Sequence, residues 1–161
     1  MRVAVVHGPN LNLLGSREPE VYGSTTLAEI DAACAQVGAG LGVEVECFQA
    51  SAEGALIDYI HEAATRVAGF VVNAGGYTHT SVALLDALVG VGRPYVEVHL
   101  SNLSAREEFR QRSLLAARAQ GIVQGFGPLG YELALRGLVS RLALAARPVA
   151  AGAPGGMEHG R

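Results

Sequence analysis

The sequence of 161 residues contains no lysine, because all twelve of its basic residues are arginine. A chain without lysine cannot bind a carbonyl compound as a Schiff base, since that bond needs a side-chain amine. Any chemistry next to a carbonyl group would therefore proceed through an enol or an enolate.

Several other features that indicate particular functions are also missing. The only two cysteines, Cys34 and Cys47, form no CxxC, and no histidine stands at metal-ligand spacing, so we expect buried thiols and no metal site. The net charge of −3 includes no basic stripe, which argues against nucleic acid or an anionic membrane as a partner and leaves a small neutral or anionic ligand. No apolar run approaches membrane-spanning length and the first residues lack a signal-peptide pattern, so we expect a cytoplasmic protein.

Short β-branched runs alternate with amphipathic segments along most of the chain. This alternation predicts an α/β protein whose parallel sheet is covered on both faces. The predicted strands are 2–6, 43–49, 69–73, 95–99 and 121–125, and the predicted helices are 26–40, 54–68, 81–91 and 131–145.

Right-handed crossovers favour a doubly wound, flavodoxin-like sheet of five strands in the order 2-1-3-4-5, within a three-layer α/β/α structure. The length and apolar content fit one domain, residues 1–147, and we expect the Gly-, Ala- and Pro-rich tail 148–161 to be disordered. Ligands of such folds bind at the carboxyl ends of the strands, near the switch point between strands one and three.

The loop after strand one is long: HGPNLNLLGSREPEVYG, residues 7–23. Asn10 offers amide groups near the sheet, and glycines bracket a segment that we interpret as a lid, with an irregular surface loop as the alternative. Tyr22 has an ordinary pKa near 10, so it can act as a base at neutral pH only if a cation such as Arg17 stabilises its phenolate. A phosphate loop is less favoured, because the glycines do not match GxGxxG.

Two further loops carry polar groups to the same edge. After strand three, NAGGYTHTS places Asn73 at the strand end and His79 in the predicted cleft, with Thr80 or Ser81 as the N-cap of the next helix and a solvated His79 as the alternative. In YVEVHLSN the alternation puts Glu97 and His99 on one face, so Glu97 can hold one ring nitrogen and leave the other free for proton transfer.

The following segment AREEFRQRS, residues 105–113, predicts a short helix with Arg106 and Arg110 on one face, either solvated or turned into the cleft. A tyrosine with an arginine, a histidine with a carboxylate, several amides and a further arginine suit proton abstraction next to a carbonyl group. A non-catalytic module that binds a small anion, or an inactive structural oligomer, would keep the same fold.

Several blocks of this sequence resemble the type II 3-dehydroquinate dehydratases of the shikimate and quinate pathways. The resemblance runs from about residue 3 to 143. Its blocks are GPNLNLLGSREPEVYGSTTL, NAGGYTHTSVAL, EVHLSN with AREEFR, and GFGPLGYELALRGL. It implies a flavodoxin-like subunit assembled into trimers and then a dodecamer, which needs no cofactor and converts 3-dehydroquinate to 3-dehydroshikimate by anti elimination of water.

The resemblance also implies roles for individual residues. Tyr22 would remove the C2 proton, with Arg17 lowering its pKa, and Asn10 would hold the water that stabilises the enolate. His99, oriented by Glu97, would protonate the departing C1 hydroxyl. The remaining implied contacts are the backbone of Leu100 and Ser101 with Asn73 on the substrate carboxylate, His79 and Arg110 on ring hydroxyls, Asp86 at the neighbouring subunit's site, and Arg106 in support.

Several positions depart from the usual family pattern. His7 stands where Asn is usual, Leu85 where Arg is common and Ser104 where His is frequent. FQASAEG replaces the more usual FQSNxEG, and the serine of SLLAARAQG is not followed by the customary proline. None of these changes removes a catalytic group. His7 ends strand one close to Asn10, where it can alter the pKa of its neighbours.

Overall fold

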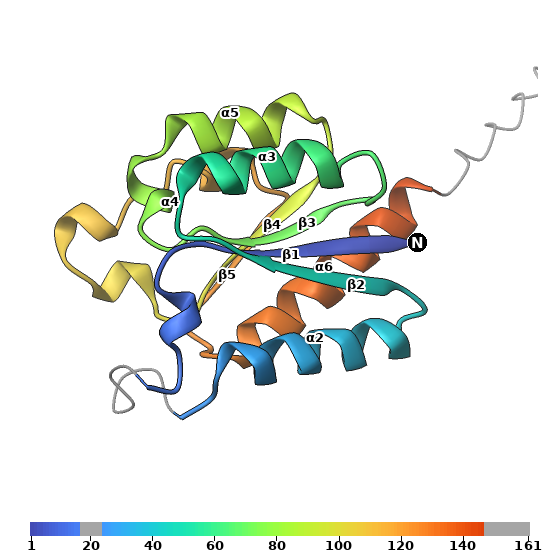
Figure 1. The fold of residues 1–161 in the computed structure, drawn as a ribbon, viewed down its shortest axis with the longest axis horizontal. Helices are drawn as coiled ribbons and strands as arrows, with labels where there is room; N and C mark the ends of the chain where they lie inside the picture. Colours follow the sequence, from blue (N-terminus) through green and yellow to red (C-terminus); the bar gives the residue numbers. More distant parts are fainter. Residues whose placement is uncertain (17–23, 147–161) are drawn as a thin grey trace, which may run out of the picture.

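The structure, a computed structural model, describes residues 1–16 and 24–146. Arg17 and Tyr22, and the tail from residue 148 onward, lie outside the described residues. Five strands form one all-parallel sheet in the order β2-β1-β3-β4-β5, which confirms the predicted topology (Figure 1). They are β1 (Arg2–His7), β2 (Glu44–Gln49), β3 (Phe70–Asn73), β4 (Tyr95–His99) and β5 (Gly121–Gln124).

Helices cover both faces of this sheet, as predicted (Figure 1). α2 (Leu27–Gly40) and α6 (Leu129–Ala145) pack on one face, and α3 (Glu53–Ala63) and α5 (Val82–Gly90) pack on the other. Successive residues of each strand point alternately into the hydrophobic cores on the two faces, because both faces of a parallel sheet are buried. Within the described part of the chain, no helix is long and apolar enough to cross a membrane.

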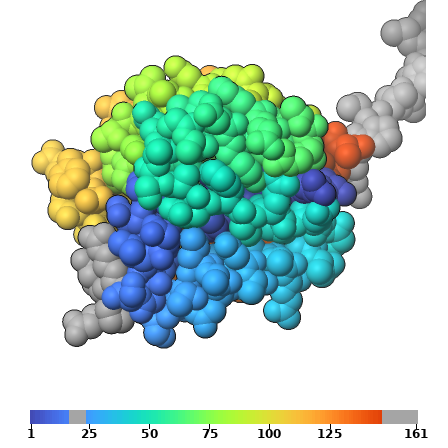
Figure 2. All heavy atoms as spheres, in the orientation of Figure 1, coloured from blue at the N-terminus to red at the C-terminus, as the bar shows by residue number. Residues whose placement is uncertain are grey.

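The carboxyl ends of the three central strands lie level with one another. His7 is opposite Asn73 in the β1–β3 register, and Val72 is opposite Glu97 in the β3–β4 register. The loops after β1, β3 and β4 therefore open at one edge of the sheet, as the fold rule predicts. Figures 1 and 2 show the segments after β1 (dark blue) and after β4 (yellow) at the same end of the molecule.

Two predicted helices differ from the structure. The helix expected over 54–68 ends at Ala63, because the chain turns and the N–H of Ala68 already donates to the Arg2 carbonyl of the sheet. The single helix expected over 105–113 was wrong: two short 3₁₀ turns, Leu103–Ala105 and Glu108–Arg110, are separated by Arg106 in an extended conformation. Short 3₁₀ turns of this kind commonly serve as connections between longer elements.

The two thiols, both predicted to be buried, lie on the α2 side of the sheet. Cys34 is buried, Cys47 is half-buried, and both are free. Burial raises the pKa of the Cys34 thiol to about 12 and raises that of Cys47 as well. Thiols in this state are poor nucleophiles at neutral pH.

Candidate active site

A cleft of about 450 Å³ lies at the carboxyl ends of β1, β3 and β4. Eight of the residues predicted from the sequence line it: Asn10, Asn73, His79, His99, Leu100, Ser101, Arg106 and Arg110. These residues come from separate stretches of sequence, so the fold brings them together as the topology requires.

The other predicted residues do not line the cleft. Glu97 is completely buried behind His99, where it can act only through that residue. Asp86 is exposed on α5, away from the lining residues. Arg17 and Tyr22 fall outside the described residues, but the two ends of their segment can be located. A Cβ at Gly15 would lie 3.0 Å from the Ser24 carbonyl oxygen, so the flanks of residues 17–23 meet beside the cleft-lining Leu14.

The loops after β1 and β3 pack closely against each other. A Cβ at Gly8 would lie 2.3 Å from the Ala74 carbonyl oxygen, which only glycine avoids. Next to this contact Asn10 has φ 69° and is the single non-glycine residue with positive φ in ranges 1–16 and 24–146. Asparagine tolerates this left-handed conformation better than most residues, and such backbone strain is typical of functional sites.

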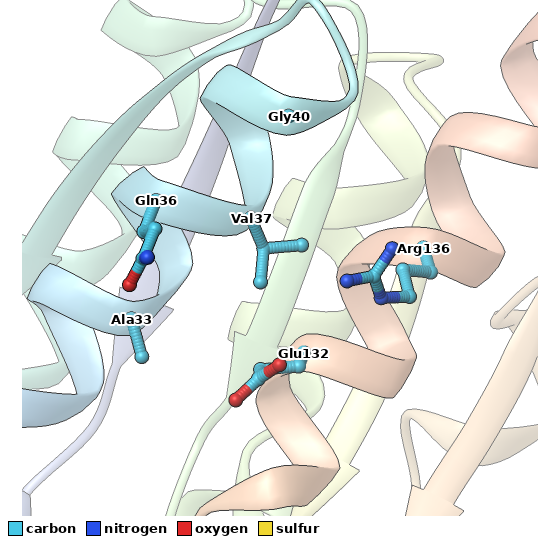
Figure 3. Close-up of a pocket in the computed structure, with 6 residues that line it drawn as sticks. All are labelled: Ala33, Gln36, Val37, Gly40, Glu132 and Arg136. Carbon is cyan, nitrogen blue, oxygen red and sulfur yellow. The ribbon is translucent and has the colours of Figure 1, made fainter.

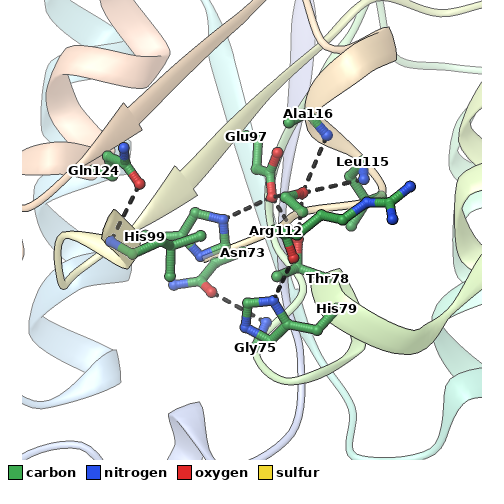
Figure 4. A network of polar contacts seen from close by, with 12 residues as sticks. Asn73, Gly75, Thr78, His79, Glu97, His99, Arg112, Leu115, Ala116 and Gln124 are labelled. Atoms are coloured by element: carbon green, nitrogen blue, oxygen red, sulfur yellow. Dashed lines mark hydrogen bonds and ion pairs between the residues drawn. The ribbon is translucent and has the colours of Figure 1, made fainter. Parts of the chain in front are cut away.

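His99 is held by Glu97 within the cleft wall (Figure 4). The distance from His99 Nε2 to Glu97 Oε1 is 2.6 Å, and both side chains are almost fully buried. An ionised carboxylate can only accept a hydrogen bond, so Nε2 carries a proton and Nδ1 is the nitrogen left for the cleft. This arrangement is the one predicted for proton transfer.

Two hydroxyl groups support the Glu97 carboxylate (Figure 4). Thr78 and Ser113 both donate to Oε1, the latter at 2.6 Å. Ser113 Oγ accepts the N–H groups of Leu115 and Ala116, each at 3.1 Å, so its own hydrogen is directed to Glu97. Burial raises the pKa of Glu97, but the hydrogen bonds from His99, Ser113 and Thr78 outweigh burial and hold it below its ordinary value.

The remaining polar side chains of the cleft also have fixed directions. His79 Nδ1 lies 2.8 Å from the Arg112 carbonyl oxygen, so Nδ1 donates and Nε2 is the nitrogen available to a ligand. Arg106 donates to the Ser101 hydroxyl at 3.2 Å. Arg110 lies 3.5 Å from the Glu107 carboxylate. The cleft lining thus includes two imidazole groups and two guanidinium groups.

Sequence reasoning missed several residues behind the cleft. Thr78 and Ser113 received no role, although a buried carboxylate in a central strand requires donors and hydroxyls follow in the adjoining loops. The sequence places His7 at the end of strand one close to Asn10 but does not reveal its partners. His7 is fully buried and contacts Tyr131 and Asp31, which no sequence pattern connects to it.

Two other places have features of a binding site. Within the described residues, one group could offer three metal ligands: His7, Asp31 and Cys47, whose ligand atoms lie within 4.8 Å of one another. A second hollow of about 460 Å³ lies between α2 and α6, where Val37, Glu132 and Arg136 face it (Figure 3). That hollow shares no lining residue with the cleft and has neither a histidine nor a nucleophile among its lining residues.

Comparisons with known proteins agree with this geometry. Residues 1–139 match the family model described as Dehydroquinase class II. A 3-dehydroquinate dehydratase from Synechococcus sp. (strain CC9605) is 56% identical over 142 residues, which cover 88% of this chain and 97% of the relative. One from Rhodopseudomonas palustris (strain TIE-1) is 55% identical over 145 residues, with 89% and 96% covered.

Solved structures give the same result. The type II dehydroquinase from Propionibacterium acnes superimposes with a TM-score of 0.82 at 42% identity, covering 86% of this chain and 96% of that one. The type II dehydroquinase from Butyrivibrio crossotus DSM 2876 gives 0.83 at 41% identity, covering 86% and 97%. This chain therefore belongs to the class II dehydroquinase family.

Proposed function

We propose that this cleft carries out the elimination of water from 3-dehydroquinate to give 3-dehydroshikimate, a step of the shikimate pathway. Membership of the family makes the chain a 3-dehydroquinate dehydratase, which is a hydro-lyase. The observation that carries the assignment to this cleft is the buried His99–Glu97 pair, which presents one imidazole nitrogen to the cleft.

The first step is removal of the C2 proton by Tyr22. Its phenolate, stabilised by Arg17, takes the proton, and the electron pair of the C–H bond passes to the C3 carbonyl oxygen as an enolate. The close approach of the flanks of segment 17–23 to the cleft supports this role, because Tyr22 stands only two residues before Ser24. Asn10 holds the water that donates to the enolate oxygen.

The second step is loss of the C1 hydroxyl. The enolate re-forms the C3 carbonyl, its electrons make the C1–C2 double bond, and the C1–O bond breaks as doubly protonated His99 gives its Nδ1 proton to the leaving oxygen. The ionised Glu97 stabilises the imidazolium before the transfer. Water leaves, and a proton passed from Tyr22 back to His99 through solvent restores both groups.

The substrate would be held by groups of known direction. The backbone of Leu100 and Ser101 with the Asn73 amide binds the carboxylate, while His79 and Arg110 bind ring hydroxyls. Arg106 supports Ser101 through its hydroxyl. These steps use side chains and backbone groups of the protein together with water, and none requires a cofactor.

The test is to mix purified protein with 3-dehydroquinate and follow the ultraviolet absorbance of the conjugated enone product. We expect a rise with wild type that Tyr22→Phe reduces by about 10²-fold or more, because the variant lacks the base. Tyr77→Phe is the matched control, since its hydroxyl donates to Ser51 outside the cleft lining. A flat trace from folded wild type would contradict the assignment, and full activity of Tyr22→Phe would remove Tyr22 as the base.

We also propose that residues 1–147 form one catalytic domain and that the chain works as a cytoplasmic homo-oligomer, a dodecamer built as a tetramer of trimers. In this assembly Asp86 reaches a neighbouring site. The exposure of Asp86 supports this, as do Val82 and Val89, which leave 58% and 39% of their surface exposed on the same helix. Sedimentation measurements of the full chain would give the assembly size, and a monomer that is fully active would overturn the shared site.

A further inference from the structure

Four side chains on the α2–α6 side of the sheet form a continuous chain of hydrogen bonds that ends at the cleft. Asp31 Oδ1 lies 2.8 Å from His7 Nε2, His7 Nδ1 lies 3.0 Å from the Tyr131 hydroxyl, and that hydroxyl lies 2.9 Å from Asn73 Nδ2. His7 and Tyr131 are fully buried and Asn73 is 3% exposed. Only Asn73 belongs to the cleft lining.

One backbone group fixes the direction of the first bond in this chain. The N–H of Gly75 donates to the other end of the Asn73 amide at 3.2 Å, so the accepting atom is the oxygen Oδ1. The atom next to Tyr131 is then the amide nitrogen, which can only donate. The Tyr131 oxygen therefore accepts a hydrogen from Asn73.

The remaining directions follow from this assignment. Having accepted from Asn73, the buried Tyr131 hydroxyl places its own hydrogen on His7 Nδ1, the other polar atom recorded next to it among the described residues. His7 then carries its proton on Nε2 and donates to Asp31. Every bond runs from the cleft toward Asp31.

This direction decides between two uses of His7. A metal held by His7, Asp31 and Cys47 would need the Nε2 lone pair, which would put the proton on Nδ1 and leave the buried Tyr131 hydrogen without an acceptor. The high pKa of Cys47 also disfavours the thiolate that such a site needs. The hydrogen-bonded chain satisfies each group and the metal does not.

We infer that His7 and Tyr131 are positioning residues that set the orientation of the Asn73 amide for binding the substrate carboxylate, an inference that rests on the proposed function. Gly75 and Tyr131 hold the two ends of the amide, which leaves one hydrogen of Nδ2 for a ligand. A rotated amide would instead present its oxygen to the carboxylate, and two acceptors repel each other. His7 keeps Tyr131 in the accepting direction.

The test compares three variants by steady-state kinetics. Tyr131→Phe removes the acceptor for Asn73, and His7→Leu removes the acceptor for Tyr131. We expect each to raise KM about tenfold with kcat changed less than about threefold, because a binding hydrogen bond is lost and the proton-transfer groups are untouched. His7→Asn restores an acceptor near the position of Nδ1, so its KM should stay within about threefold of wild type.

A second readout separates positioning from general damage. In Tyr131→Phe the ratio of kcat/KM for 3-dehydroquinate to kcat/KM for its methyl ester should fall about tenfold. The ester is uncharged, so it gains less than the carboxylate from a correctly oriented Asn73 amide. Equal losses for acid and ester, or a fall in kcat alone, would overturn the inference. If wild type binds 3-dehydroquinate without turning it over, the proposed function is contradicted but the inference about Asn73 can still be tested. Calorimetry then compares the affinity of wild type and Tyr131→Phe for 3-dehydroquinate and for its methyl ester.

Discussion

The two buried histidines, His7 and His99, occupy equivalent places at the ends of their strands but have different surroundings. Each ends a strand that pairs with β3, and each has Nε2 within 2.8 Å of a carboxylate oxygen. The partner of His99 is the fully buried Glu97, whereas the partner of His7 is Asp31, whose side chain is 34% exposed.

The second ring nitrogen separates their roles. Nδ1 of His7 is taken by Tyr131, so both nitrogens are in use and the ring can only hold its neighbours in place. His99 lines the cleft, so its Nδ1 can exchange a proton with a ligand. A carboxylate bonded to one ring nitrogen therefore does not by itself distinguish a catalytic histidine from a structural one. The two histidines differ in whether the second ring nitrogen is already bonded within the protein.

Replacing His99 should have the largest effect and give the sharpest contrast with His7. We expect His99→Gln to lower kcat by about 10²–10⁴-fold, because the proposed general acid is lost while an amide hydrogen can still bond to Glu97. The matched change His7→Gln should leave kcat within about threefold of wild type, because the proposed proton-transfer groups are untouched. Stopped-flow absorbance at saturating substrate measures both, and similar losses of kcat would break the distinction.

Replacing the partner of His99 should have the next largest effect. Glu97→Gln removes the charge that stabilises the imidazolium, so we expect kcat to fall about 10²-fold. Asp31→Asn, the matched change on the other histidine, should leave kcat nearly unchanged.

Glu97→Gln also gives a test of how stability depends on pH. The lowered pKa of Glu97 means that its stabilising contribution is fully present above the ordinary pKa of a glutamate and is lost as pH falls through the lowered folded-state value. Thermal unfolding should therefore show wild type more stable than Glu97→Gln at neutral pH, with the difference shrinking in acid. A difference that grows on acidification would contradict the direction of the shift.

Removing one of the hydroxyl donors should have the smallest effect. Ser113→Ala deletes a hydrogen bond to the Glu97 carboxylate and also the acceptor of the Leu115 and Ala116 N–H groups. Together these losses should cost at least about 1.5–3 kcal/mol of unfolding free energy. We expect kcat to fall less than tenfold, because Thr78 and His99 still donate to Glu97. Ser104→Ala, at an exposed serine, is the control for chemical denaturation, and an equal loss there would show that the bond to Glu97 contributes nothing.

The sequence predicted the sheet well, because its signals are local. Buried strands read as continuous β-branched runs, and right-handed crossovers leave few orders for five parallel strands. The cleft residues followed from the same topology, since the rule about carboxyl ends points to particular loops. The pairing of Glu97 with His99 could be predicted because the two residues are neighbours on one strand face.

The parts that could not be predicted depend on distant contacts. Asn73 and Tyr131 are 58 positions apart and His7 and Tyr131 are 124 apart, and no periodicity relates them. The segment 105–113 has helical spacing, but the Arg106 side chain reaches back to Ser101 and its backbone is extended. In that segment tertiary contacts overrode the local preference for a helix.

The fixed directions of the cleft groups also give it a handedness. An amide hydrogen at Asn73, a ring nitrogen acceptor at His79 and a guanidinium at Arg110 come from three different elements and are not interchangeable. A mirror-image ligand can match only two of three unlike contacts at a time. The same hydrogen bonds that order the side chains thus make the cleft selective for one enantiomer.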